Sequence, residues 1–250
     1  MYYLTDVKEE DVDFVIAVSV GTQNIPSFKR ISLELLDKHP VSETGYSFLT
    51  YNSGVKAINT FQTTYSSNAQ VKNVIENIQP RAGVSSRLDL ALTEAKKLFA
   101  NGSGSRPHAR KVVVIYTDTE PTGDDGGDAV AKTAKAMEDE GIQIIVVVLN
   151  MSSVPQVCEV ITPNKESVIP TTDGEDPKEV VKKIDNVLKE GMSGKMWFVC
   201  VARFQSDFNL FISKVKLPVW KPLKLQYQRV CFPPYYDTCW ENFLEHEDVL

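Results

Sequence analysis

The chain has 250 residues, of which 42% are hydrophobic and 24% charged, so a single α/β domain can bury a large core without a disulfide or a metal. The formal net charge is −6, and the absence of a clustered Lys/Arg run argues against nucleic-acid binding. No stretch reaches the ~20 apolar residues that a membrane-spanning helix needs, and the first residues lack the basic start and apolar run of a signal peptide.

Continuous apolar runs rich in β-branched residues predict three strands that are buried on both faces. These are Asp13–Val20, Lys111–Tyr116 and Ile142–Leu149. Shorter strands are predicted at Gly45–Tyr51, Val55–Phe61 and Ser167–Pro170. Because Asn52-Ser53-Gly54 separates the first two of these, they should form an antiparallel hairpin.

Apolar residues at helical spacing predict helices between the strands. The strongest pattern runs from Ser86 to Ala100, with one apolar stripe along its length. The other predicted helices are residues 27–38, 68–79, 129–140, 154–160 and 177–189. In the last of these, Asp176 is the expected N-cap and Pro177 the first helical residue.

This alternation predicts a doubly wound α/β fold. We expect a mostly parallel six-stranded sheet in the order 3-2-1-4-5-6, with one antiparallel edge strand and helices on both faces. The domain should span residues 10–192, because the βα rhythm stops near Gly191–Gly194. Residues 193–250 are rich in aromatic residues and prolines and form a C-terminal extension whose fold the sequence does not predict.

In such sheets, ligands bind outside the carboxyl ends of the strands. The loop after the first strand reads VGTQN and has neither of the glycine patterns that close a backbone around phosphate. The three histidines are scattered, with no nucleophile spaced to them. The sequence therefore indicates a binding protein rather than an enzyme.

Four segments, in order, resemble the von Willebrand factor type A domain. DVDFVIAVSVG (11–21) resembles the family's first strand, D-x-x-F-L-[IV]-D-x-S-x-S, and GVSSRLDLALTEAKKLF (83–99) resembles its G-x-T-x-T-x-x-A-L helix start. KVVVIYTDTEPTGDD (111–125) resembles the strand and loop that contain T-D-G, and AMEDEGIQIIVVVL (136–149) resembles the next helix and strand. The segment SRLDLAL is similar to the corresponding segment of matrix members of the family, such as matrilins and type VI collagen.

The resemblance implies a metal-ion-dependent adhesion site, in which hydroxyl and carboxylate groups hold one divalent cation. On the matching positions, its remaining ligands are Ser19, Ser86 and Asp118. Ala17 stands where the family has its first Asp, and Gly21 stands where it has its second Ser. A hard cation such as Mg²⁺ or Mn²⁺ held by one carboxylate should bind weakly, so the expected site is weak or vestigial and no cofactor is assigned.

The same resemblance implies that a protein partner contacts the loop rim. The expected rim residues are Thr22, Gln23, Glu120, Asp124 and Asp125. The leading hypothesis is a secreted adhesion or extracellular matrix module, within a longer or truncated precursor, that binds a matrix protein, such as a collagen-like one, without strong metal dependence. The alternative is an intracellular scaffold for complex assembly, which the missing signal peptide and the few cysteines favour.

The four cysteines have no zinc-site spacing. They are Cys158, Cys200, Cys231 and Cys239, and the sequence leaves open whether any of them pair. Asn101-Gly-Ser103 and Asn150-Met-Ser152 are glycosylation sequons, which matter only if the chain is secreted.

Overall fold

The computed structural model describes residues 11–21, 24–81, 86–100, 102–118, 127–151, 153–162 and 164–190. The predicted extension, 193–250, and the proposed boundary before it lie outside these ranges. Within them, no helix is long and apolar enough to cross a membrane.

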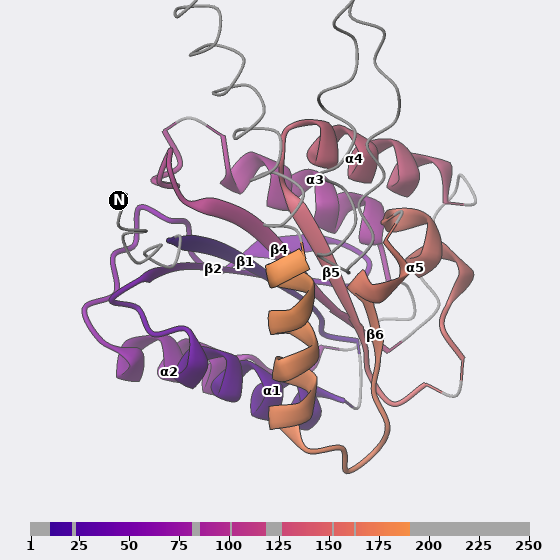
Figure 1. Ribbon diagram of the computed structural model, residues 1–250, viewed down its shortest axis with the longest axis horizontal. Coiled ribbons are helices and arrows are strands. Elements are labelled where there is room, and N and C mark those ends of the chain that lie inside the picture. Colours follow the sequence, from indigo (N-terminus) through magenta and orange to yellow (C-terminus); the bar gives the residue numbers. More distant parts are fainter. Residues whose placement is uncertain are drawn as a thin grey trace, which may run out of the picture. The chain divides into compact units, whose positions relative to one another are not determined.

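The predicted sheet and its strand order are confirmed. Six strands lie in the order β3-β2-β1-β4-β5-β6, and all neighbours are parallel except β2 and β3. The strands are β1 Val12–Ser19, β2 Thr44–Tyr51, β3 Val55–Ala57, β4 Arg110–Thr117, β5 Gln143–Val148 and β6 Val168–Pro170. Figure 1 shows β1 and β4 near the centre of the twisted sheet.

Helices cover both faces of the sheet (Figure 1). One face carries α1 (Ile25–Lys38), α2 (Asn68–Asn77) and a C-terminal helix over residues 177–190. The other face carries α3 (Leu88–Leu98), α4 (Asp128–Asp139) and the short α5 (Gln156–Ile161). A single 3₁₀ turn, Lys165–Ser167, precedes β6.

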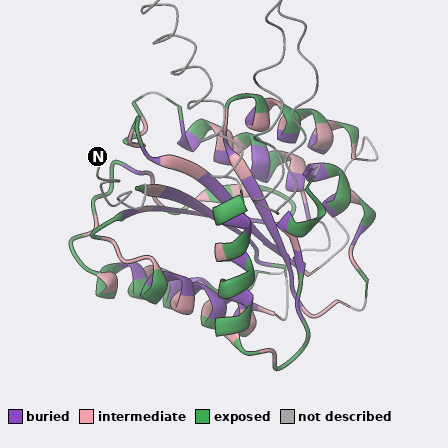
Figure 2. Cartoon of the chain, viewed as in Figure 1, coloured by how far each residue is buried: buried purple, intermediate pink, exposed green. Residues whose placement is uncertain are grey.

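The period-two pattern of the strands builds two separate cores. From β1, Phe14, Ile16 and Val18 face α1 and α2, whereas Val15 and Ala17 face α3 and α4. All five side chains are fully buried, and Figure 2 shows the buried strands between helices whose outer faces are exposed. Burial on both faces explains why this strand reads as an unbroken apolar run.

The edge strand β3 is shorter than the predicted Val55–Phe61, because a side chain takes over its pairing with β2. Ile58 N still donates to Phe48 O at 2.8 Å. Asn59 then accepts from Phe48 N at 2.8 Å through Oδ1 and donates to Tyr46 O at 3.0 Å through Nδ2. The backbone of Asn59 is therefore free to leave the strand direction while the β2 groups stay satisfied.

The C-terminal helix is part of the domain. Its apolar side chains in the core are Val180, Val181, Ile184, Val187 and Leu188. His39 Nε2, just after α1, lies 2.7 Å from Asp185 Oδ1, and Gln143 Nε2 at the start of β5 donates to Val187 O at 3.0 Å. The helix thus joins two elements that are far apart in the chain.

We therefore predict that a chain ending at residue 192 unfolds cooperatively in urea, because it keeps this helix and both cores. A chain ending at residue 176 should lose cooperativity, because removal of the C-terminal helix uncovers the apolar face of the sheet. An insoluble 1–192 protein beside a soluble full-length chain would show that the extension belongs to the core.

An ion pair between a buried carboxylate and a half-buried arginine lies at the amino-terminal edge of the sheet. The Asp13 side chain is 1% exposed, and its Oδ1 accepts from Arg106 Nε at 2.8 Å. Its Oδ2 accepts from Arg106 N at 2.7 Å and from Ser105 Oγ at 3.1 Å. These bonds attach the 102–107 loop to β1.

Arg106→Met should lower the free energy of unfolding by about 3 kcal/mol, because it leaves the buried Asp13 carboxylate without its counter-charge. The exposed Arg30 of α1 offers a matched control, and Arg30→Met should change the unfolding free energy by less than about 0.5 kcal/mol. Equal urea midpoints for the two variants would contradict the assigned role of the pair.

Candidate functional site

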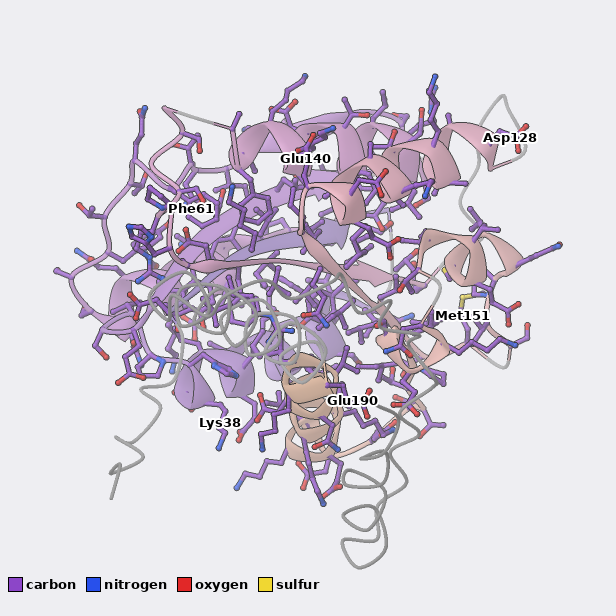
Figure 3. The ribbon with its side chains drawn as sticks, turned by 45° about the horizontal axis from the view of Figure 1, so that its top comes forward. Lys38, Phe61, Asp128, Glu140, Met151 and Glu190 are labelled. Atoms are coloured by element: carbon purple, nitrogen blue, oxygen red, sulfur yellow. The ribbon has the colours of Figure 1, made fainter. Side chains whose placement is uncertain are left out.

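The carboxyl ends of the parallel strands gather the expected site residues at one edge of the sheet. Ser19 is the last residue of β1, and Asp118 directly follows β4. Since β1 and β4 are parallel neighbours, both residues lie at the same edge. Figure 3 shows Asp128 and Met151, which come after β4 and β5, on one side of the molecule, and Phe61 on the other.

Tyr51 occupies the centre of this edge. It ends β2 and pairs with Ser19 of β1, and its hydroxyl donates to Tyr116 O of β4 at 3.2 Å. The phenol therefore reaches from β2 across β1 to β4. The side chains of Thr117 and Ser86 lie beside this hydroxyl. Burial is the main reason why the pKa of the Tyr51 hydroxyl is raised.

The backbone before α3 brings Ser86 to this centre. Arg87 N donates to Asn52 O at 2.8 Å, and Leu88 N donates to Ser86 O at 3.0 Å. The first helical hydrogen bond runs from Ala91 N to Arg87 O at 3.2 Å, so the helix begins at Leu88 rather than at the predicted Ser86. Ser86 is consequently a buried loop residue, 2% exposed, beside Tyr51.

Asp118 is hydrogen bonded to one asparagine, which is in turn hydrogen bonded to a second. Its Oδ2 accepts from Asn24 Nδ2 at 3.1 Å. Asn24 Oδ1 in turn accepts from Asn150 Nδ2 at 2.7 Å. We call Asn24, Asp118 and Asn150 the amide clasp; all three residues are half-buried.

The structure thus places Ser86 and Asp118 around Tyr51, with Ser19 on the adjacent strand. The expected rim residues Thr22, Gln23, Glu120, Asp124 and Asp125 lie outside the described residues. Sequence reasoning missed Asn24, Tyr51 and Asn150. The only signal for Tyr51 was its place at the end of a strand, and Asn24 and Asn150 are loop asparagines of a very common kind.

The described residues do not fit a tightly bound divalent cation. Mg²⁺ prefers near-octahedral oxygen ligands, with carboxylates to balance its charge. Here Asp118 is the one carboxylate at the centre of the described edge, and Ala17 contributes a buried methyl group to the core. Among the residues that the structure describes, no group of three or more His, Cys, Asp or Glu could hold a metal ion.

Three buried tyrosines give the domain a predicted alkaline limit. Burial raises the pKa of Tyr51 and Tyr116, and burial together with the charges of Tyr116 and Asp37 raises that of Tyr46. Unfolded tyrosine ionises near pH 10. These neutral phenols therefore contribute fully to stability below about pH 10, and their contribution falls as the pH rises further, since only the unfolded state releases their protons.

We predict that the unfolding free energy drops above pH 10 by up to ~1.4 kcal/mol per pH unit for each of these tyrosines. Tyr51→Phe should cost roughly 1–2 kcal/mol at pH 8, because the bond to Tyr116 O is lost, and should reduce the slope above pH 10. Urea unfolding between pH 8 and pH 11 measures both effects. An unchanged slope in the variant would show that Tyr51 ionises in the folded chain.

Comparison with known proteins connects this geometry to a family. The family model of the von Willebrand factor type A domain matches residues 11–187. No match was found among curated protein sequences.

Several solved structures share the fold. Proximal thread matrix protein 1 from the mussel byssus is 18% identical, with a TM-score of 0.61 over 69% of this chain and 46% of that chain; this chain therefore spans less than half of its length. TRAP from Plasmodium vivax, in a manganese-loaded structure, is 16% identical, with a TM-score of 0.56 over 70% of this chain and 72% of that chain. BatB from Bacteroides thetaiotaomicron is 15% identical, with a TM-score of 0.53 over 71% and 99%. At these identities the likeness shows the fold alone.

Proposed function

The chain belongs to the von Willebrand factor type A domain family, and from this premise we propose that it is an adhesion or extracellular matrix module. Domains of this family generally bind other proteins rather than catalyse reactions. We propose a protein partner, such as a collagen-like matrix protein, bound by the loops at the carboxyl edge of the sheet. In this proposal the chain has no catalytic role and works outside the cell.

The observation that carries the proposal is the convergence of loops from three parts of the chain. Ser19 ends β1, Asp118 directly follows β4 and Ser86 lies in the loop before α3, and all three lie near Tyr51. A rim built from separate loops on a rigid sheet is a common way to place binding residues. The presence of a mussel thread matrix protein among the structures of similar fold is consistent with a matrix role.

The proposed contact residues are Thr22, Gln23, Glu120, Asp124 and Asp125. They belong to the segments that follow β1 and β4 in the sequence. The last three are acidic, so the proposed rim favours a partner surface with basic groups over one that offers only a carboxylate. Ser19 and Ser86 are too deeply buried, at 3% and 2% exposure, to contact a partner directly.

The binding experiment uses the full chain and a triple-helical collagen-like peptide as the probe. Replacing Glu120, Asp124 and Asp125 together by alanine should weaken binding at least about tenfold, which corresponds to ~1.4 kcal/mol. Asp139→Ala is the control, because Asp139 is an exposed acidic residue that ends α4, at the opposite end of the helix from Asp128. EDTA should change the dissociation constant by less than about twofold.

Equal binding by the rim variant and by the control would contradict the proposed surface. Absence of any binding to the collagen-like peptide would remove that partner class and leave other matrix proteins to be tested in the same way. Recovery of the endogenous protein from the cytosolic fraction of its tissue would overturn the matrix assignment in favour of an intracellular assembly scaffold.

A further inference from the structure

We propose that the amide clasp takes the place of a divalent cation in this chain, so that the loops of the binding edge are fixed by neutral hydrogen-bond donors. This inference rests on the proposed function in one respect only. If the binding edge contacts a partner, that binding should be insensitive to chelators. The clasp itself stands on the contacts of Asn24, Asp118 and Asn150.

The side chain of Asn24 is committed to the clasp at both of its polar ends. Its Nδ2 donates to Asp118 Oδ2 at 3.1 Å, and its Oδ1 accepts from Asn150 Nδ2 at 2.7 Å. The same residue is the N-cap of α1, and its carbonyl accepts from Phe28 N at 3.0 Å. The helix therefore fixes the backbone that presents the amide.

A plain helix-capping role does not explain Asn24. An asparagine at an N-cap normally accepts a hydrogen bond from a backbone N–H of the first helical turn through its side-chain oxygen. Asn24 makes no such bond, because its oxygen is directed to Asn150 instead. The side-chain amide of Asn24 thus bonds to the carboxylate that follows β4 rather than to its own helix.

The position of Asn150 is fixed by its backbone conformation and its hydrogen bonds. It has a φ of 52°, in the left-handed region where asparagine is one of the few side chains that is tolerated. Its backbone N donates to Thr171 O at 3.1 Å, and its Nδ2 lies 3.5 Å from Ser27 Oγ. The clasp therefore joins the segments that follow β1, β4, β5 and β6.

The charge at this edge suits an amide better than a dication. The clasp contains one carboxylate, and a hydrogen bond from an amide to a carboxylate is charge-assisted and stronger than a neutral one. A divalent cation bound through Asp118 Oδ2 would have to displace Asn24 Nδ2, and among the described residues of the clasp it would gain a single formal negative charge. The buried methyl group of Ala17 supplies no second carboxylate.

The test is an isosteric substitution. Asn24→Asp replaces the donating Nδ2 by an oxygen and sets a second carboxylate against Asp118, at the 3.1 Å spacing of the present bond. In EDTA, we expect its melting temperature to fall by roughly 5 °C through like-charge repulsion. Because two carboxylates now face each other, ~10 mM Mg²⁺ or Mn²⁺ should restore most of the loss.

Asn68→Asp provides the matched control. Asn68 is the first residue of α2, and only its side-chain oxygen is used, accepting from Val41 N at 3.0 Å. The same charge is therefore added at another helix start without loss of a donor. Its melting temperature should stay within about 1 °C of the unmodified chain, with or without cation.

The unmodified chain should melt at the same temperature in EDTA and in Mg²⁺, whereas a site filled at 1,000 times its dissociation constant would raise the melting temperature by about 10 °C. Saturable Mg²⁺ binding by the unmodified chain at micromolar concentration would overturn the inference. So would an Asn24→Asp chain that melts like the Asn68→Asp control. Neither readout uses a partner, so a failed clasp and a failed binding assignment remain distinguishable.

Discussion

Hydrogen bonding in a sheet that is covered on both faces decides where this molecule can interact with anything else. The backbone groups of β1 are shared with β2 and β4 along its whole length, and its side chains enter one core or the other. Irregular backbone is left only at the strand ends. The carboxyl ends gather the loops of five parallel strands, and this makes that edge the one suited to recognition.

At this edge, side-chain amides stabilise the charge of a half-buried carboxylate. Asp118 directly follows the central strand β4 and brings a negative charge into a half-buried place, where an isolated carboxylate would be costly. Asn24 meets the charge with an amide, and Asn150 orients that amide. The side chain of Tyr51 reaches from β2 across β1 and donates to Tyr116 O of β4.

The fold could be predicted from the sequence because its signals are local and repeated. The strands of the sheet centre are apolar on both faces, and the helices show clear stripes, so the strand order follows from the βα rhythm and the handedness of its crossovers. The end of β3 could not be predicted, because it depends on Asn59 replacing backbone partners of a neighbouring strand.

The chemistry of the edge was predictable only in part. The position of Asp118, and the absence of a carboxylate at Ala17, can be seen in the sequence alone. The partners that Asp118 has instead are 94 residues before it and, through Asn24, 32 residues after it. Nothing in the local sequence marks such asparagines, since their role arises from tertiary distance rather than from spacing along the chain.

The clasp also sets a condition on covalent modification. Asn150 belongs to the sequon Asn150-Met-Ser152, and the atom to which an oligosaccharide would be attached is the Nδ2 that donates to Asn24. Carbohydrate on this nitrogen would stand where Asn24 and Ser27 now lie. If the chain enters the secretory pathway, folding and glycosylation therefore compete for Asn150 Nδ2. A domain in which the clasp forms before glycosylation would carry no oligosaccharide at Asn150.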